Sequence, residues 1–393
     1  MKNKIAIASA AFLAASGASQ AEIVINDFLS FEGFVDMSYA HYDGEIDNNV
    51  ANESDNSFAI DQVEINWLFD FDPVTAQIDF DYEDNDEDTV EVEQAFVNYD
   101  LGNGGTITAG RYDSMLGFEA FEPTGLYQYS FAYGLPSFTG DLLDGLGGGI
   151  GGDDVSAISA ALFPVGPRQS QGVKYTYETD TSFFGISLQD GVSNYEGRLG
   201  GDNDKDGTGF DGGGYGVEVA GSVILADGVT WFLGGFYEDG DGYNTTNINT
   251  GDTEAYAINS YVTFETGAWI FAAEVTYGEN EWDQGTTGTL PWDLDINSLN
   301  ALLMANFAYS DQGSITGRVS YVDSELEADT VPGDVTFEYL KYTLAHSWAF
   351  TDNLLLVTEV SYLDGEIDDS TGTTGFNEDF DELLAAVELI FSF

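Results

Sequence analysis

From residue 28 onward, hydrophobic and polar residues alternate along this chain in many short segments. In the segment VTAQIDFDYE (residues 74–83), every second residue is hydrophobic and those between are polar or acidic. A period of two predicts β-strands with one apolar and one polar face. We expect sixteen strands, over residues 29–42, 56–71, 74–84, 88–101, 105–113, 171–179, 181–191, 213–226, 228–240, 252–266, 268–279, 292–310, 313–325, 335–350, 353–364 and 378–393.

The links between these expected strands alternate strictly in length. Seven are short and consist mostly of the Gly, Asn, Asp and Pro residues that tight turns require. The eight others are mostly longer, over residues 43–55, 85–87, 114–170, 192–212, 241–251, 280–291, 326–334 and 365–377. Short turns at one end and longer loops at the other are typical of a transmembrane barrel, whereas a soluble sandwich does not sort its loops this way. The expected fold is therefore all-β, a transmembrane antiparallel β-barrel of sixteen strands.

The last segment, LLAAVELIFSF (residues 383–393), alternates in the same way and ends on Phe393. We expect it to pair with residues 29–42 and close the barrel, with Glu388 and Ser392 on the lumen side. A terminal strand of this kind looks like that of Gram-negative outer-membrane barrels, in which it is the signal read by the barrel-assembly machinery. Aromatic residues fall near both ends of the expected strands, as the two membrane interfaces favour.

The first 21 residues are expected to lie outside the fold. Lys2 and Lys4 precede an apolar run that is too short to span a bilayer, and Ser19-Gln20-Ala21 has the small-x-small pattern of a cleavage site. This predicts a secretory signal peptide over residues 1–21 and an exported barrel over residues 22–393. No later run of about 18 apolar residues predicts a membrane-spanning helix.

The composition narrows the function further. The chain has no cysteine, so disulfides and thiolate metal sites are excluded. A formal net charge of −61 makes nucleic-acid binding electrostatically implausible. Such a charge is also typical of disorder, but 43% hydrophobic and 14% aromatic residues argue against that. Two interpretations of the acidity remain open: a lumen that favours cations, or a hydrated surface suited to a saline habitat.

The link over residues 114–170 is far longer than any other, and a structureless loop of that size is unusual in a compact domain. It is the third long loop and follows the fifth strand, the position from which a porin loop folds into the lumen. Residues 115–138 are rich in aromatic side chains, which can hold a fixed shape against the barrel wall. We expect residues 114–170 to constrict or plug the lumen; the alternative is that their aromatic rings cover the barrel mouth or a subunit contact.

At this loop the sequence resembles the OmpL-like β-barrel porin family. The motifs that carry the resemblance are Gly110-Arg111-Tyr112, Gly117-Phe118-Glu119 and the Pro136 to Gly140 exit, PSFTG. The resemblance is clearest over residues 31–140, and the glycine-rich stretch of residues 142–152 departs from it. It implies an outer-membrane general porin of a Gram-negative bacterium, and porin analogy suggests a homotrimer.

Few basic residues exist, so each can be considered as part of a pore constriction. General porins often place wall arginines opposite acidic loop residues. Arg318 shares a polar strand face with Ser320, whereas strict alternation turns Arg111 outward. The expected constriction residues, basic ones first, are Arg111, Lys174, Arg318, Asp113, Glu119 and Glu122. A local salt bridge is the alternative role for each basic residue.

One acidic segment matches the start of a calcium-binding loop, with the pattern D-x-D-x-D-G. Its candidate ligands are Asp202, Asp204, Asp206 and Asp211. The twelfth position is Gly213, where an EF-hand needs a bidentate glutamate, so a solvated acidic loop is the alternative. No catalytic motif is present, and we expect neither enzyme activity nor a required cofactor.

Together these observations predict passive diffusion of small hydrophilic solutes, with a preference for cations, through a barrel embedded in outer-membrane lipid. The alternatives are a substrate-specific channel and a plugged barrel with a surface-binding or structural role.

Overall fold

The computed structural model describes residues 22–46, 51–83, 90–136, 162–165, 168–190, 214–241, 250–284, 293–328, 333–370 and 377–393. The predicted signal peptide, residues 1–21, lies outside the described residues. Among the described residues, no helix is both long and apolar enough to cross a membrane.

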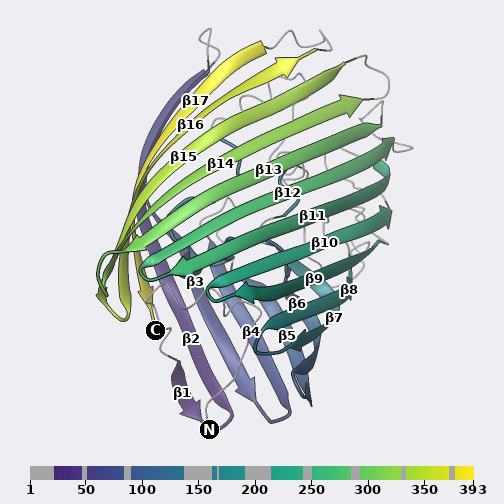
Figure 1. Ribbon diagram of the computed structural model, residues 1–393, viewed down its shortest axis with the longest axis vertical. Helices are drawn as coiled ribbons and strands as arrows, with labels where there is room; N and C mark the ends of the chain where they lie inside the picture. The colour runs from purple at the N-terminus through teal and green to yellow at the C-terminus, as the bar shows by residue number, and fades with distance from the viewer. Residues whose placement is uncertain are drawn as a thin grey trace.

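The described residues form one antiparallel sheet of seventeen strands (Figure 1). Sixteen of them, β2 to β17, pair in sequence order, and β17 pairs with β2, so the sheet closes into a barrel. The strands are β1 (Ile23–Asn26), β2 (Leu29–Ile46), β3 (Ala51–Asp70), β4 (Val74–Glu83), β5 (Val90–Gly102), β6 (Gly105–Asp113), β7 (Gln169–Glu178), β8 (Ser182–Gln189), β9 (Tyr215–Ala226), β10 (Val229–Asp241), β11 (Thr250–Thr266), β12 (Trp269–Gln284), β13 (Leu294–Ala308), β14 (Gly313–Ala328), β15 (Asp334–Thr351), β16 (Leu354–Asp369) and β17 (Asn377–Ser392). The prediction of a sixteen-stranded antiparallel barrel is confirmed.

The seam of the barrel lies where both ends of the described chain meet β2. β17 pairs with β2 from Phe380 opposite Ile46 to Ser392 opposite Phe34. Beyond that point Gly33 and Phe393 exchange two backbone hydrogen bonds of 2.9 Å. The short strand β1, which the sequence pattern did not predict, pairs with residues 29–31. The predicted partnership of the first and last strands is therefore correct.

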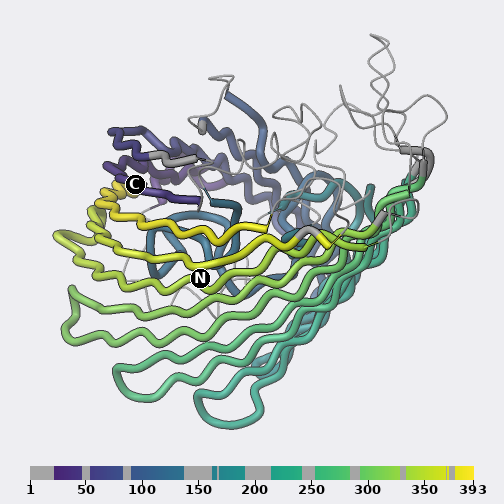
Figure 2. Tube along the Cα trace, turned by 90° about the horizontal axis from the view of Figure 1, so that it is seen from above, coloured from purple at the N-terminus to yellow at the C-terminus, as the bar shows by residue number. Residues whose placement is uncertain are grey.

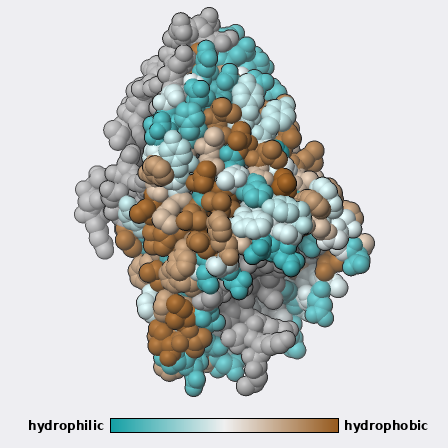
Figure 3. Space-filling view, turned by 90° about the vertical axis from the view of Figure 1, so that its left-hand side faces the viewer, coloured by the Kyte–Doolittle hydropathy of each residue, from teal (hydrophilic) through white to brown (hydrophobic). Residues whose placement is uncertain are grey.

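Each strand has an apolar outer face and a more polar inner face. On β17, Val387 and Phe391 are 46% and 43% exposed, whereas Glu388 and Ser392 are each 2% exposed. The same alternation recurs in β13 and β15. Figure 3 shows hydrophobic side chains gathered over the middle of the outer surface, with hydrophilic ones towards the upper end. This distribution suits a sheet with lipid outside and water or protein inside.

Several strands are longer than the sequence pattern predicted. β2 runs to Ile46 and β3 begins at Ala51, whereas residues 43–55 were expected to form a loop. Similarly, β12 continues to Gln284 rather than ending at residue 279. In these extensions the inward side chains stay buried, as Ile46 and Trp282 show, so the backbone ladder continues although the outward residues are no longer apolar.

The wall of strands curves around the trace of the described parts of the link between β6 and β7 (Figure 2), and the apolar core lies on the inner side of this wall rather than between layers. Leu116 and Val165 pack with inward side chains of β9 to β11, and Phe118 and Ala132 pack with those of β12 and β13. Leu162 and Phe163 join a third apolar cluster with inward side chains of β12 to β17 and of β2. The described parts of the long link between β6 and β7 thus lie against the inner wall.

Candidate functional site: the barrel interior

The long link is fastened to the inner wall mainly through its own backbone. Inward-facing side chains of β9, β11, β12, β15 and β16 accept hydrogen bonds from its amide groups. These bonds run from Met115 N to Glu218 Oε1 (2.6 Å), Gly117 N to Asn259 Oδ1 (3.2 Å), Phe118 N to Glu274 Oε1 (2.7 Å), Ser130 N to Glu359 Oε2 (3.0 Å) and Gly134 N to Tyr339 Oη (3.1 Å). An irregular segment needs such partners for its backbone groups when it is buried. We call residues 114–136 the anchored loop.

An ion pair between Arg318 and Glu119 joins the anchored loop to β14. Arg318 Nη1 lies 2.5 Å from Glu119 Oε1, and the side chains are 0% and 11% exposed. Arg318 Nη2 also donates to the carbonyl of Phe131 at 2.9 Å. Glu119 in turn accepts a 2.6 Å hydrogen bond from the backbone amide of Ala132. One buried charge pair therefore fixes two turns of the loop against each other and against the wall.

The other predicted constriction residues occupy a second region, around β6 and β7. Lys174 Nζ donates to the backbone carbonyl of Asp113 at 3.2 Å and lies 4.2 Å from the centre of the Tyr112 ring. Arg111 interacts electrostatically with Glu93 and Asp113. Hence Arg111 and Lys174 lie near Asp113, whereas Arg318 of β14 meets Glu119.

Glu122 does not face any of the predicted basic partners. Glu122 directly precedes the short 3-10 helix η2 (Pro123–Gly125) of the anchored loop. Its Oε2 accepts a 2.9 Å hydrogen bond from Gln62 Nε2 of β3. One carboxylate oxygen each of Glu64, Glu93 and Glu122 lies within 4.8 Å of the others. Two negative charges at that separation repel by about 3.5 kcal/mol at an effective dielectric constant of about 20. Burial, together with the carboxylates of Glu64 and Glu93, raises the pKa of the Glu122 carboxyl well above its usual range.

Two β-bulges increase the number of acidic side chains on this wall. On β5, Gln94 pairs with Asp79 and Val92 with Phe80, so Glu93 is an extra residue. On β3, Gln62 and Ala59 pair with Asp36 and Ser38 of β2, so two residues of β3 oppose one of β2. Bulges re-aim side chains in this way and are common beside functional sites.

Sequence reasoning identified the anchored loop and Arg318 but missed most of the wall residues that meet them. Glu64 could have been found, because it alternates with outward Ile65 and Val63. Glu93 could not, because the bulge breaks the alternation on β5. Glu218, Glu274 and Glu359 follow their strand alternation, but nothing in the sequence indicates that they bind loop amides.

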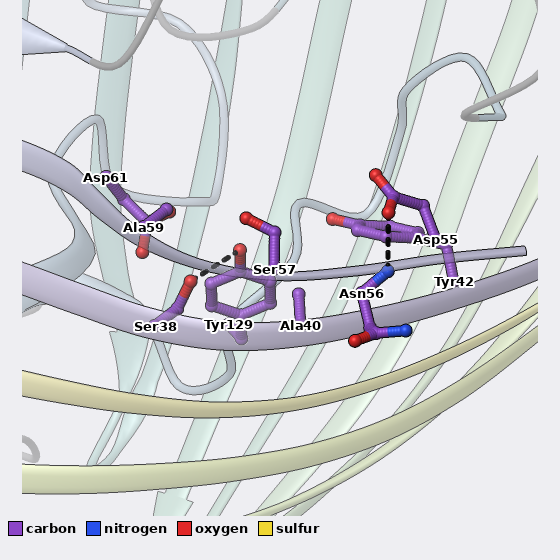
Figure 4. A pocket seen from close by; sticks show the side chains of 9 residues that line it. All are labelled: Ser38, Ala40, Tyr42, Asp55, Asn56, Ser57, Ala59, Asp61 and Tyr129. Carbon is purple, nitrogen blue, oxygen red and sulfur yellow. Dashed lines mark hydrogen bonds between the residues drawn. The ribbon is translucent and has the colours of Figure 1, made fainter.

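A polar cavity of about 360 Å³ lies between β2, β3 and the anchored loop (Figure 4). Tyr129 of the loop and Ser38 of β2 meet there, with their hydroxyl oxygens 3.3 Å apart. The remaining lining residues are Ala40, Tyr42, Asp55, Asn56, Ser57, Ala59 and Asp61. Two tyrosine rings with carboxylate and amide groups can contact a hydrophilic solute through both ring faces and hydrogen bonds.

The predicted calcium ligands Asp202, Asp204, Asp206 and Asp211 lie outside the described residues. The same holds for the glycine-rich part of the long link, residues 142–152.

Comparisons with known proteins agree with this architecture. The model of a family described as putative beta-barrel porin-2, OmpL-like, matches residues 157–393. Among solved structures, OmpT of Vibrio cholerae shares 14% identity at a TM-score of 0.56, with 95% of this chain and 100% of that chain covered. The anion-selective porin from Comamonas acidovorans shares 12% identity at a TM-score of 0.54, with 93% and 99% covered. The outer-membrane channel DcaP of Acinetobacter baumannii also shares 12% identity at 0.54, with 93% and 97% covered. No curated protein matches the chain in sequence.

Proposed function

We propose that this chain, which belongs to the OmpL-like beta-barrel porin family, is an outer-membrane porin. Small hydrophilic solutes diffuse through it passively, and cations pass in preference to anions. No chemical step is needed. Closed backbone hydrogen bonding lets the sheet cross the bilayer, and the inward polar face hydrates the path. We do not expect it to be an enzyme, since its family is described as a porin family and the structures it is similar to include a porin and a channel.

The acidic inner wall of β3 to β5 is the observation that supports cation preference. Its inward carboxylates are those of Glu64, Asp79, Asp81 and Glu93, and the first three are buried. Glu122 of the anchored loop adds a fifth carboxyl group, beside Glu64 and Glu93. Arg111 and Lys174 are the nearby basic residues, so negative charge is in excess. A narrow path past such a wall has a negative potential, which concentrates cations and repels anions.

The anchored loop is proposed to set the aperture. Its amide groups bind wall carboxylates, and the Arg318–Glu119 pair joins it to β14. A loop held at this many points keeps a defined position across the interior, as a size filter requires. The apolar contacts of Leu162, Phe163 and Val165 with the wall lead to the alternative, a barrel plugged by the whole long link, residues 114–170.

Planar-bilayer recording tests this proposal. We expect the purified barrel to form channels, and in a KCl gradient the zero-current potential should have the sign produced by K⁺ flow from the concentrated side. The potential should decrease as ionic strength rises, because salt screens the wall charges. A folded protein that gives no channels would reject the porin and favour the plugged barrel. Channels with the opposite sign would reject only the cation preference.

A substrate-specific channel is the second candidate, and the cavity between β2, β3 and Tyr129 favours it. Its tyrosine rings and acidic groups would slow a sugar or an organic cation that passes. In that case a low concentration of the solute should block the current saturably, and Tyr129→Ala should weaken the block. A current that changes linearly with solute concentration, without saturation, would exclude the substrate-specific channel and favour the general porin.

We also propose that the barrel is a homotrimer in outer-membrane lipid and that the barrel-assembly machinery inserts it. OmpT of Vibrio cholerae has been solved in a trimer form. Native mass spectrometry of the detergent-extracted protein would measure the subunit number, and a monomer would contradict the proposal.

A further inference from the structure

Three carboxylates from three separate parts of the chain meet in the barrel interior. Glu64 belongs to β3, Glu93 to β5 and Glu122 to the anchored loop, and each offers an oxygen within 4.8 Å of the other two. The loop and the wall thus contribute to one cluster, at a point where no hydrophobic cluster holds them together among the described residues.

The cluster contains acceptor atoms that the described protein does not satisfy. Glu64 is 1% exposed, and among the described residues its Oε2 has no hydrogen-bond partner. The Oε2 of Glu93 also has none. The neighbouring donors reach other atoms, because Gln169 Nε2 binds Glu93 Oε1 at 2.8 Å and Gln62 Nε2 binds Glu122 Oε2. A buried carboxylate oxygen without a donor is uncommon in folded proteins and calls for a partner.

The basic groups nearby are too few to balance the charge. Arg111 interacts electrostatically with Glu93, but also with Glu91 and Asp113. Lys174 interacts with Asp113 and Glu218 instead of the cluster. Both basic side chains therefore interact with carboxylates other than those of Glu64 and Glu122.

We propose that Glu64, Glu93 and Glu122 bind a divalent cation, Ca²⁺ in preference to Mg²⁺, which fastens the anchored loop to the acidic wall. Carboxylate oxygens are the ligands that both ions prefer, and three oxygens within 4.8 Å of one another can share one ion. Ca²⁺ is preferred here because it accepts several carboxylates in an irregular arrangement. Mg²⁺ demands a near-ideal octahedron and gives up its water reluctantly. Water molecules complete the six to eight oxygen ligands of the ion.

Binding has a consequence for permeation, and this part rests on the proposed function. The ion neutralises carboxylates where the loop approaches the wall, so bound Ca²⁺ lowers the cation selectivity of the channel. It also restrains Glu122, because a ligand on the loop and two on the wall share one ion.

The test is calorimetric titration of the EDTA-treated, full-length barrel in detergent, with CaCl₂ and separately with MgCl₂. About 0.5 M KCl in the buffer screens diffuse binding by the acidic surface, since the Debye length is then only a few ångströms. We expect one Ca²⁺ site per chain with weaker Mg²⁺ binding. The triple variant Glu64→Gln, Glu93→Gln and Glu122→Gln should lose the site. Glu93→Gln alone should weaken it about tenfold or more, which keeps the test valid if the triple variant does not fold.

A matched control replaces another set of inward acidic residues, as Asp36→Asn, Asp61→Asn and Glu388→Gln. Asp36 and Glu388 are buried and interact electrostatically with Asp61. The control should retain the Ca²⁺ isotherm. Identical isotherms for the wild type and the Glu93→Gln variant would overturn the proposal and leave a proton shared by Glu64 and Glu122 as the explanation of their proximity. Preferential Mg²⁺ binding would overturn the choice of ion.

Bilayer recording separates this proposal from the porin itself. Addition of CaCl₂ should reduce the reversal potential of the wild type but not of the triple variant. If no channels form, the porin proposal fails while the calorimetric result still stands. If channels form and the titration shows no specific site, the cation site fails and the porin remains.

Discussion

At the scale of single residues, whether a side chain faces the interior depends on strand register as much as on residue type. Arg318 follows the alternation of β14 and is fully buried inside the barrel, beside Glu119. Glu93 faces its acidic neighbours because a bulge adds one residue to β5. The alternation is visible in a sequence, but a bulge depends on hydrogen bonds to a strand elsewhere in the chain.

Gly33 gives a prediction at this scale, because it lies at the seam of the barrel. A Cβ atom built there would lie 2.2 Å from the backbone oxygen of Glu64 and 3.1 Å from the ring of Phe393. Neither the paired backbone nor the terminal ring can move without disturbing the closure. We expect Gly33→Ala to lower the free energy of unfolding by about 1–3 kcal/mol.

The control for Gly33→Ala is Gly317→Ala on β14, where an added Cβ has no atom within 4 Å. The measurement is the urea midpoint of each variant refolded into lipid vesicles, with heat-modifiable gel mobility as the readout of folded barrel. Equal midpoints for Gly33→Ala and Gly317→Ala would show that the seam tolerates a side chain and contradict this account.

At the scale of elements, the sequence predicted all sixteen barrel strands but not β1 or the full length of the others. β1 has only four residues, too few for a period to be recognised. At the end of β2 the outward residues Asp43 and Glu45 are charged and exposed, although the inward Ile46 is buried, so the outer face is no longer apolar there. Local alternation therefore identifies the part of a strand within the membrane better than its extension beyond.

The anchored loop shows where sequence reasoning about the interior ends. Its length and aromatic content predicted a defined structure, and its contacts with the wall agree with that. The partners of its amides could not be predicted, since Glu218, Glu274 and Glu359 are more than 80 residues further along the chain. Such pairings depend on the path of an irregular backbone, for which no periodic pattern exists.

Glu274 gives a prediction at this scale. Its Oε1 accepts hydrogen bonds from Phe118 N and, at 2.8 Å, from Asn259 Nδ2. Glu274→Ala leaves a buried amide without an acceptor, which typically costs about 1–3 kcal/mol. We expect hydrogen–deuterium exchange across residues 114–134 to become about tenfold faster or more, while exchange in the strands is unchanged.

Two further variants define what Glu274 contributes. Glu274→Gln keeps a carbonyl oxygen at the same place and should restore most of the protection against exchange. Glu366→Ala removes an exposed carboxylate of β16 and should leave exchange in the loop as in the wild type. If Glu274→Ala exchanged no faster than the wild type, the wall carboxylates would not be what holds the anchored loop.

At the scale of the whole molecule, the outer surface combines an apolar middle with aromatic side chains towards both ends. Trp269, Tyr309 and Phe350 are exposed near the short turns, and Tyr277 and Tyr362 are exposed nearer the opposite ends of their strands. Rings with a polar atom favour the two membrane interfaces. The predicted girdles therefore enclose an apolar band, which assigns the hydrocarbon region of the bilayer to the strand segments between them.

This assignment predicts that the cost of a charge on the outer surface depends on its depth. Leu303 of β13 is 64% exposed and lies four residues from Phe307, whose ring stacks on Trp269 at 4.5 Å. Leu225 is 60% exposed but is next to the turn that follows β9. Leu303→Arg should destabilise the barrel in vesicles by about 2–4 kcal/mol, and Leu225→Arg by about 0–1 kcal/mol.

Urea unfolding in vesicles measures both costs. Because the two leucines are almost equally exposed, only the surrounding lipid can make their costs differ. In detergent micelles, which adapt their thickness to the protein, the difference should decrease. Equal costs in vesicles would place both residues at one depth and remove the basis for this position of the membrane.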